Sequence, residues 1–175
     1  MRNRKPTEEA SNLSPEERRK RTFDKAIKLI SVKSRSIAGL RERLLQYGWA
    51  DKVDVETVIS RLKEYGYLDD ERFAFNYASL KVKQRPLGRR RMERELQFKK
   101  VDAEVADEAL ELVYAETSEE ELIDRAIEKR IRLRGRPKTR LEVKSLFDHL
   151  LRQGFSFELV SNKVRTVSQS EFDEE

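Results

Sequence analysis

The sequence predicts an all-α protein, and three observations lead to that prediction. Glycine and proline account for only 6 and 4 of the 175 residues, so the chain has few turns. Helix start signals recur along it, and the apolar residues between them have the spacing of one helical face. No segment alternates long enough to indicate a strand. Charged residues make up 41% of the chain and apolar residues 37%, which favours several small cores over one large core.

Seven of the nine predicted helices begin at a recognisable cap. Ser14, Ser118 and Thr139 precede a glutamate by three residues, the spacing of a capping box in which hydroxyl and carboxylate each accept a backbone N–H. Asp or Ser residues flanked by apolar residues mark four further starts: Asp51, Asp69, Asp102 and Ser156. Apolar spacing then predicts helices over residues 15–33, 37–47, 52–65, 70–84, 88–99, 103–115, 119–134, 140–152 and 157–168.

The helices fall into three groups that can be aligned with a period of roughly 50 residues. In this alignment Leu44 matches Leu96 and Leu150, and Trp49 matches Val101 and Phe155. Gly48 and Gly154 suit a left-handed end of the second helix, where Lys100 would be mildly strained. Because one three-helix unit is small, we expect the repeats to stack into an elongated, curved array. The predicted parts are a flexible extension 1–14, repeats 15–68, 69–117 and 118–168, and an acidic tail 169–175.

Charge is strongly segregated, although the net charge is only +5. Nine bases and two acids lie in 81–100, eleven acids and one base in 101–128, and eight bases and one acid in 129–144. The basic blocks surround the connection between the first and second helix of each repeat. Such corners suit a polyanion or an acidic protein groove, although bases at helix ends also complement the helix dipole. The candidate binding residues are Lys33, Arg35, Lys83, Arg85, Arg89, Arg90, Arg91, Arg134, Arg136, Lys138 and Arg140.

Signals for catalysis, cofactors and metals are weak. The chain has no cysteine and one histidine, so thiolate sites and the usual zinc spacings cannot be built. Phosphate-loop, dinucleotide-binding and zinc-protease motifs do not occur. Asp69, Asp70 and Glu71 could in principle hold Mg²⁺, but first-turn carboxylates are more readily explained as helix caps. We interpret His149 as a boundary residue. The sequence therefore predicts a protein that is not an enzyme and needs no cofactor or metal.

Two further classes are disfavoured. No stretch approaches the ~18 apolar residues of a membrane span, so we expect a cytoplasmic protein. The second and third helices of each repeat resemble a helix-turn-helix outline, but in the second repeat the would-be recognition helix carries acids and no base. Because phosphates would repel that helix, sequence-specific DNA recognition is not expected. Trp49 and Phe155 are interpreted as packing residues rather than base stackers, since their equivalent Val101 cannot stack.

One segment resembles the hallmark of the RecX family of RecA recombinase regulators. It reads Leu62-Lys63-Glu64-Tyr65-Gly66-Tyr67-Leu68-Asp69-Asp70-Glu71-Arg72-Phe73-Ala74. Lys33 to Ser36, Leu40 and Leu44 to Trp49 resemble the first repeat of that family, and the likeness extends from about Phe23 to Val167. Gly39 within a helix, a slightly longer segment 50–54 and Lys100 in place of a turn glycine depart from the family pattern.

The resemblance implies an array of three-helix repeats that lodges in the groove of the RecA–DNA filament and restrains its extension or promotes its disassembly. It further implies lowered ATP hydrolysis, strand exchange and co-protease activity, in DNA repair and the SOS response. We expect a monomer whose partners are RecA and non-specific DNA. Two alternatives remain: a non-specific DNA-binding module that acts without a recombinase, and a scaffold that uses the acidic helix near residues 102–111.

Overall fold

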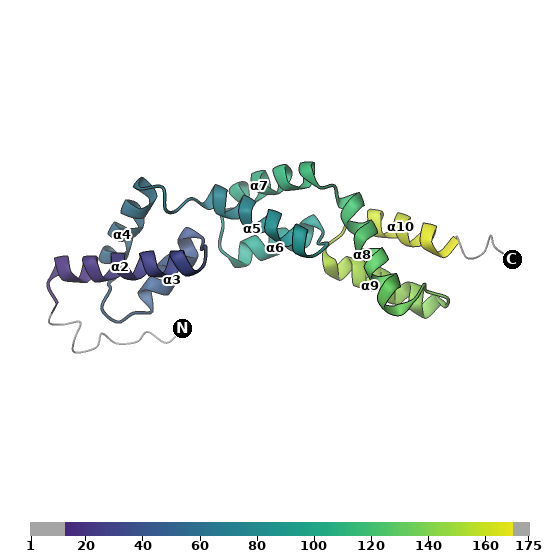
Figure 1. The fold of residues 1–175 in the computed structure, drawn as a ribbon, viewed down its shortest axis with the longest axis horizontal. Helices are drawn as coiled ribbons and strands as arrows, with labels where there is room; N and C mark the ends of the chain where they lie inside the picture. The colour runs from purple at the N-terminus through teal and green to yellow at the C-terminus, as the bar shows by residue number, and fades with distance from the viewer. Residues whose placement is uncertain (1–12, 170–175) are drawn as a thin grey trace. The chain divides into compact units, whose positions relative to one another are not determined.

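The computed structural model describes residues 13–169, and within them all regular structure is helical, as predicted (Figure 1). Most of the predicted extension 1–14 and of the predicted acidic tail 169–175 lies outside the described residues. The helices are α2 (Pro15–Val32), α3 (Ile37–Leu45), α4 (Lys52–Glu64), α5 (Asp70–Gln84), α6 (Arg89–Phe98), α7 (Ala103–Glu116), α8 (Glu119–Arg134), α9 (Arg140–Gln153) and α10 (Phe157–Gln169). Each lies within two residues of its predicted limits.

The chain divides into two compact units. Unit 1 comprises the chain up to Ala74 together with Phe98–Asp102, and unit 2 comprises Phe75–Gln97 and the chain from Ala103 onward. The division into three repeats at 68/69 and 117/118 remains a prediction.

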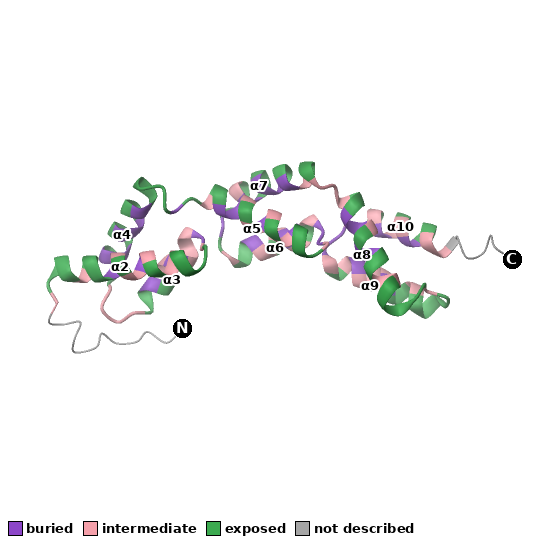
Figure 2. Ribbon diagram, viewed as in Figure 1, coloured by how far each residue is buried: buried purple, intermediate pink, exposed green. Residues whose placement is uncertain are grey.

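Unit 1 is a three-helix bundle in which α2, α3 and α4 pack against one another. Its core contains fully buried residues from each helix, among them Ala26 of α2, Leu40 of α3 and Leu62 of α4. These positions lie on the helix faces that the apolar spacing predicted, and Figure 2 shows buried and exposed faces alternating along each helix. Hydrophobic burial, which contributes roughly 1.5–3 kcal/mol for a large aliphatic side chain, therefore holds the bundle together.

In unit 2, α8, α9 and α10 form a second mutually packed group. Leu122 and Leu150 are fully buried, and Phe155 is 1% exposed. Tyr77 of α5 donates a hydrogen bond to Glu95 of α6 (2.8 Å), so α5 and α6 are joined as well. Leu96 and Leu150, which the repeat alignment matched to Leu44 of unit 1, are buried, and so is Leu44.

The predicted helix caps at Ser14, Ser118 and Thr139 are present in the structure. Ser14 and Thr139 form complete capping boxes with Glu17 and Glu142. The hydroxyl of Ser118 accepts the N–H of Glu121 at 3.2 Å. The backbone N–H groups of Lys138 and Thr139 lower the pKa of Glu142, as expected for a carboxylate that accepts two backbone hydrogen bonds.

The turns after the second helices differ from one another. Gly154 follows α9 in the left-handed conformation (φ 95°), and Lys100 adopts φ 59°, so both predictions are confirmed. The prediction of a left-handed end at Gly48 was wrong, because α3 stops at Leu45 and is followed by a right-handed Gln46 (φ −74°). The chain then closes a tighter turn in which Tyr47 N–H bonds to Leu44 O at 3.0 Å.

Candidate functional site

The structure distributes the predicted basic residues over both units. Lys33 and Arg35 lie in unit 1, just after α2, and the others lie in unit 2. Lys33 is exposed, whereas Arg35 is half-buried and its Nε has no hydrogen-bond partner among residues 13–169.

Unit 2 contains a cavity of about 340 Å³ that gathers basic residues from four segments. Two of the predicted residues, Arg85 and Arg91, line it. The cations that accompany them, and the histidine, come from α5, α8 and α9: Lys81, Lys129, Arg130 and His149. Part of the wall is apolar, formed by Pro86, Leu87, Ala126 and Leu133, and Gln153 completes the lining.

Glu95 is the acidic residue in the cavity lining, and its carboxylate is already engaged. It accepts the Tyr77 hydroxyl, and its oxygens lie 3.9 Å from Lys81 Nζ and 3.5 Å from Arg91 Nε. Within the described part of the chain, no carboxylate forms an ion pair with Arg85, Lys129 or Arg130. The cavity therefore holds more positive charge than its own acids neutralise.

Two bases of the cavity, His149 and Arg130, have lowered pKa values. Burial, and then the charges of Arg130, Arg152 and Arg134, lower the pKa of His149. Burial followed by Arg134 and Arg152 lowers the pKa of Arg130 as well. Arg130 donates to the hydroxyl of Ser145 (3.2 Å), a neutral partner. A bound anion would relieve both perturbations, because an opposite charge nearby favours the protonated form.

A second hollow, of about 390 Å³, adjoins the first because Pro86 and Lys129 line both. It adds Arg125 and Arg132 of α8, together with Gln84 and Glu128. Seven lysine and arginine side chains thus lie along two neighbouring hollows.

Adjacent arginines at the start of α6 have different surroundings. Arg89 Nη2 bonds to Asp107 of α7 at 2.5 Å, and Arg89 Nε lies 3.4 Å from Glu93. These two carboxylates engage the guanidinium inside the unit. Arg90 is exposed, and the described residues supply no ion-pair partner for it.

The remaining predicted bases lie at the surface of unit 2. Lys83 is exposed near the end of α5. Arg134 ends α8, and the other three occupy the connection to α9 and its first residue: Arg136, Lys138 and Arg140. All four are exposed and surround the α8–α9 corner.

The cavity borders a close contact between two backbone segments of unit 2. The N–H of Gly88 donates to Gln153 O at 3.0 Å. A Cβ on Gly88 would meet Gly154 C at 2.4 Å, and a Cβ on Gly154 would meet Arg91 Cβ at 2.4 Å. The start of α6 is thereby fixed against the α9–α10 turn, which places Arg91 at the edge of the cavity.

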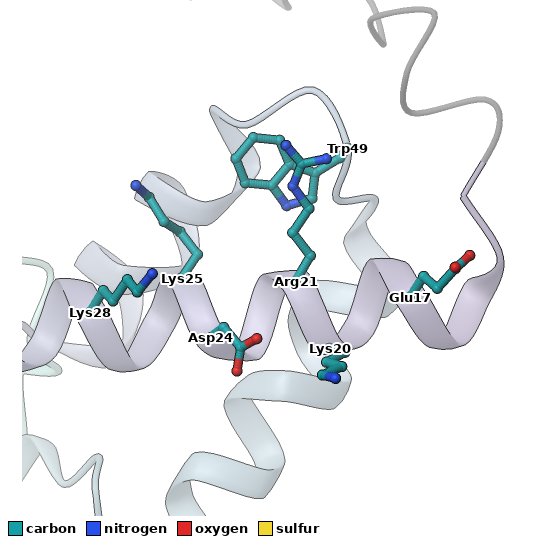
Figure 3. A pocket seen from close by; sticks show the side chains of 7 residues that line it. All are labelled: Glu17, Lys20, Arg21, Asp24, Lys25, Lys28 and Trp49. Carbon is teal, nitrogen blue, oxygen red and sulfur yellow. The ribbon is translucent and has the colours of Figure 1, made fainter.

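Unit 1 has a basic patch of different composition, centred on Trp49 (Figure 3). The Arg21 guanidinium lies 4.3 Å from the centre of the Trp49 ring, and Trp49 stacks on Tyr47 with ring centres 4.6 Å apart. Lys25 Nζ lies 4.8 Å from the centre of the Tyr47 ring. Trp49 is thus partly exposed and held by cation–π contacts rather than buried as Phe155 is.

Sequence reasoning missed several of these residues. Lys81, Lys129 and Arg130 lie within or beside the recognised basic blocks but were not selected, because a block does not reveal which side chains face one another. His149 is partly buried, as a boundary residue would be, but it also lines the cavity. The available signal that His149 lines the cavity was its position four residues before Gln153, on the helix that ends at the α9–α10 turn.

The carboxylates at the start of α5 act as caps. Asp69 accepts the N–H of Arg72 at 2.9 Å, and Asp70 accepts the N–H of Ile37, the first residue of α3, at 2.8 Å. Burial is the main cause that raises the pKa of Asp70. Over residues 13–169, no group of three or more His, Cys, Asp or Glu side chains is placed to hold a metal ion. No helix in that range is both long and apolar enough to span a bilayer.

These features define a class: all-helical, three-helix-repeat proteins that carry unneutralised basic surfaces. A family model described as "RecX, second three-helix domain" matches residues 69–110. The chain is 32% identical over 142 residues to Regulatory protein RecX of Bacillus licheniformis, covering 81% of this chain and 53% of that protein. It is 32% identical to Regulatory protein RecX of Mycolicibacterium smegmatis, covering 81% of this chain and 77% of the relative.

The chain belongs to the RecX family. A crystal structure of RecX from Lactobacillus salivarius superposes with a TM-score of 0.74 at 17% identity, over 86% of this chain and 96% of that one, and shows the same fold. The chain spans about half the length of some of the relatives that it matches, such as the Bacillus protein.

Proposed function

We propose that this protein is a non-enzymatic modulator, mainly an inhibitor, of the RecA recombinase. In this proposal it binds in the groove of the RecA–DNA filament as a cytoplasmic monomer. It limits filament extension, and with it ATP hydrolysis, strand exchange and co-protease activity in DNA repair and the SOS response. Membership of the RecX family supports a regulatory role of this kind.

One observation carries the proposal: unit 2 gathers Arg85, Lys129 and Arg130 around a cavity with no free carboxylate to balance them. A filament presents phosphates and acidic side chains, which would supply the missing negative charge. The exposed bases of the α8–α9 corner and Arg90 would add contacts that hold the protein in place. Arg89 is expected to contribute less, since Asp107 and Glu93 already engage it.

The decisive experiment is single-stranded-DNA-dependent ATP hydrolysis by the cognate RecA, titrated with this protein at near-physiological salt. Inhibition at substoichiometric protein that persists in excess DNA would support filament binding. A variant with Arg134, Arg136, Lys138 and Arg140 all changed to Gln should inhibit less while retaining its helical circular dichroism spectrum. No inhibition by the unaltered protein would refute the proposal.

The alternative is a sequence-nonspecific DNA-binding module that acts without recombinase. The patch around Arg21, Lys25 and Trp49 favours it. Aromatic residues flanked by lysine and arginine side chains are common at surfaces that bind single-stranded nucleic acid. It predicts that any inhibition disappears in excess DNA, since the protein would merely sequester the strand.

A further inference from the structure

We propose that the cavity lined by Arg85, Arg91, Lys129, Arg130 and His149, with its adjoining hollow, binds two or more consecutive phosphates of a single nucleic-acid strand. This inference deepens the proposed function and rests on it for its biological meaning. Its test requires no recombinase, so the two can fail separately.

The first step of the argument is the charge inside the cavity. Lys81, Arg85, Arg91, Lys129 and Arg130 approach one space together with His149, against the one engaged carboxylate of Glu95. Like charges held together without counter-ions oppose one another. Burial, and then the nearby charges of Arg134 and Arg152, lower the pKa of Arg130. Structural ion-pair networks, such as Arg18 with Asp54 in unit 1, are instead matched in charge.

The second step is the shape of the basic surface. The two hollows share Pro86 and Lys129, and Arg125 and Arg132 continue the positive charge beyond the first cavity, where Glu128 is the one acid in the lining. A single carboxylate or phosphate would occupy one hollow and leave the other unbalanced. A nucleic-acid strand carries a negative charge on every nucleotide, so it can place successive phosphates in both.

The third step is the chemistry of the lining. No Phe, Tyr or Trp side chain lines either hollow, so neither offers the large aromatic surfaces on which bases commonly stack. Lysine and arginine side chains supply donors for phosphate oxygens, and such contacts carry no sequence information. The site is therefore a backbone site, indifferent to base identity.

His149 provides a reporter inside the cavity, since it is the chain's single histidine. The groups that face it are Lys81 of α5, Arg91 and Glu95 of α6, Lys129, Arg130 and Arg134 of α8, and Arg152 of α9. Nearly all of them are positive. Burial, and then the charges of Arg130, Arg152 and Arg134, hold the pKa of His149 below its usual value. A phosphate placed among them must raise it, because the anion favours the imidazolium form.

The test is an NMR titration of the His149 ring protons in the full chain, with and without saturating oligothymidylate. We expect the oligonucleotide to raise the pKa of His149. The double variant Lys129→Gln with Arg130→Gln should bind the oligonucleotide roughly tenfold more weakly at 0.15 M salt. The slope of the logarithm of its binding constant against the logarithm of salt concentration should be shallower by about 1 to 2. The control Arg94→Gln with Arg165→Gln removes the same charge from exposed positions outside both hollows, and should keep the pKa shift.

Thermal unfolding establishes whether the double variant is folded. If it does not fold, the single variant Lys129→Gln, at an exposed position, replaces it. An unchanged His149 pKa in the saturated complex would overturn the proposal, and so would equal affinities of the double variant and the control. A polyglutamate peptide that raises the pKa at lower concentration than the oligonucleotide would overturn it in favour of an acidic protein segment. Normal oligonucleotide binding without RecA inhibition would refute the proposed function alone.

Discussion

The N–H of Gly88 donates to the carbonyl oxygen of Gln153, 65 residues later in the chain, at 3.0 Å. A Cβ on Gly88 would lie 2.4 Å from the carbonyl carbon of Gly154 and from Phe155 N, so the contact joins backbone to backbone. No flexible side chain lies between these segments to absorb a change. This contact is therefore a sensitive position in unit 2.

Gly88→Ala is expected to destabilise the protein by about 2–3 kcal/mol, the upper part of the range for overpacking. Urea unfolding measures the difference. The matched control is Gly66→Ala, where no atom lies within 4 Å of the added Cβ but φ is +70°, so only backbone strain of about 1–2 kcal/mol applies. If Gly88→Ala were as stable as the unaltered protein, the backbone contact would not exist in solution.

Asp54 is 2% exposed and accepts from Arg18 Nε at 2.9 Å and Arg19 Nε at 3.3 Å. Asp54→Asn keeps the shape but removes the charge that balances two arginines. We expect a loss of about 1–3 kcal/mol in the free energy of unfolding, measured by denaturant titration. The control is Asp24→Asn, at an exposed position of α2, which should change the free energy of unfolding by less than about 0.5 kcal/mol. Equal losses in the two variants would contradict a structural role for Asp54.

Lys100 adopts a left-handed conformation (φ 59°) and its ammonium pairs with Glu42. Lys100→Ala removes the ion pair and keeps the strained backbone, whereas Lys100→Gly removes both. Because a left-handed conformation costs a non-glycine residue about 1–2 kcal/mol, the Gly variant should be more stable than the Ala variant by about 1 kcal/mol. Thermal unfolding midpoints of the two variants, compared directly, check this order; the reverse order would show that Lys100 is unstrained.

Stability is expected to depend on pH through His149. Its pKa is lowered in the folded state, so the unfolded chain binds the proton more readily. The free energy of unfolding should therefore be highest above about pH 6.5 and fall as the pH drops below that value, until the folded-state pKa is passed. Urea unfolding at pH 7.5, 6.5 and 5.5 measures the slope, and His149→Gln should flatten it. A slope unchanged in His149→Gln would assign the dependence to another group.

Arg89 and Arg90 are adjacent but should behave differently. Arg89→Gln breaks the contacts to Asp107 and Glu93, so it should lower the free energy of unfolding, by up to about 1 kcal/mol for exposed pairs of this kind. Arg90→Gln, at an exposed position, should leave stability unchanged and weaken binding to oligothymidylate. Unfolding curves and fluorescence anisotropy on the same two variants separate the effects. Identical behaviour of the two variants would refute the distinction.

Local sequence patterns were sufficient to predict the helices. The caps at Ser14 and Thr139 depend on residues three positions apart, and the burial of Leu44, Leu96 and Leu150 follows from helical spacing, so both could be read from the chain. The end of α3 could not, because the turn closes at Gln46 and Tyr47, where Tyr47 stacks on Trp49, before Gly48 is reached.

The cavity depends on contacts between distant segments, which no local pattern reveals. Arg85 and Arg130 lie 45 positions apart, and which arginine of the 89–91 run faces the cavity depends on how α6 is turned against α9. Arg89 faces Asp107 instead, and Arg91 lies against Gly154. The sequence indicated that positive charge gathers in this part of the chain. It did not indicate which basic residues of each run line the same cavity.

Arg91 belongs to two features at once, because its Cβ lies against Gly154 and its side chain lines the basic cavity. A ligand that contacts the Arg91 side chain in the cavity therefore also contacts a residue of the close backbone contact between α6 and the α9–α10 turn. A ligand that binds the packed arrangement of these segments better than an opened one favours the packed arrangement by the difference in its binding free energy. An anion bound in the cavity would therefore make this contact harder to open, so that the stiffness of unit 2 would depend on whether the cavity is occupied.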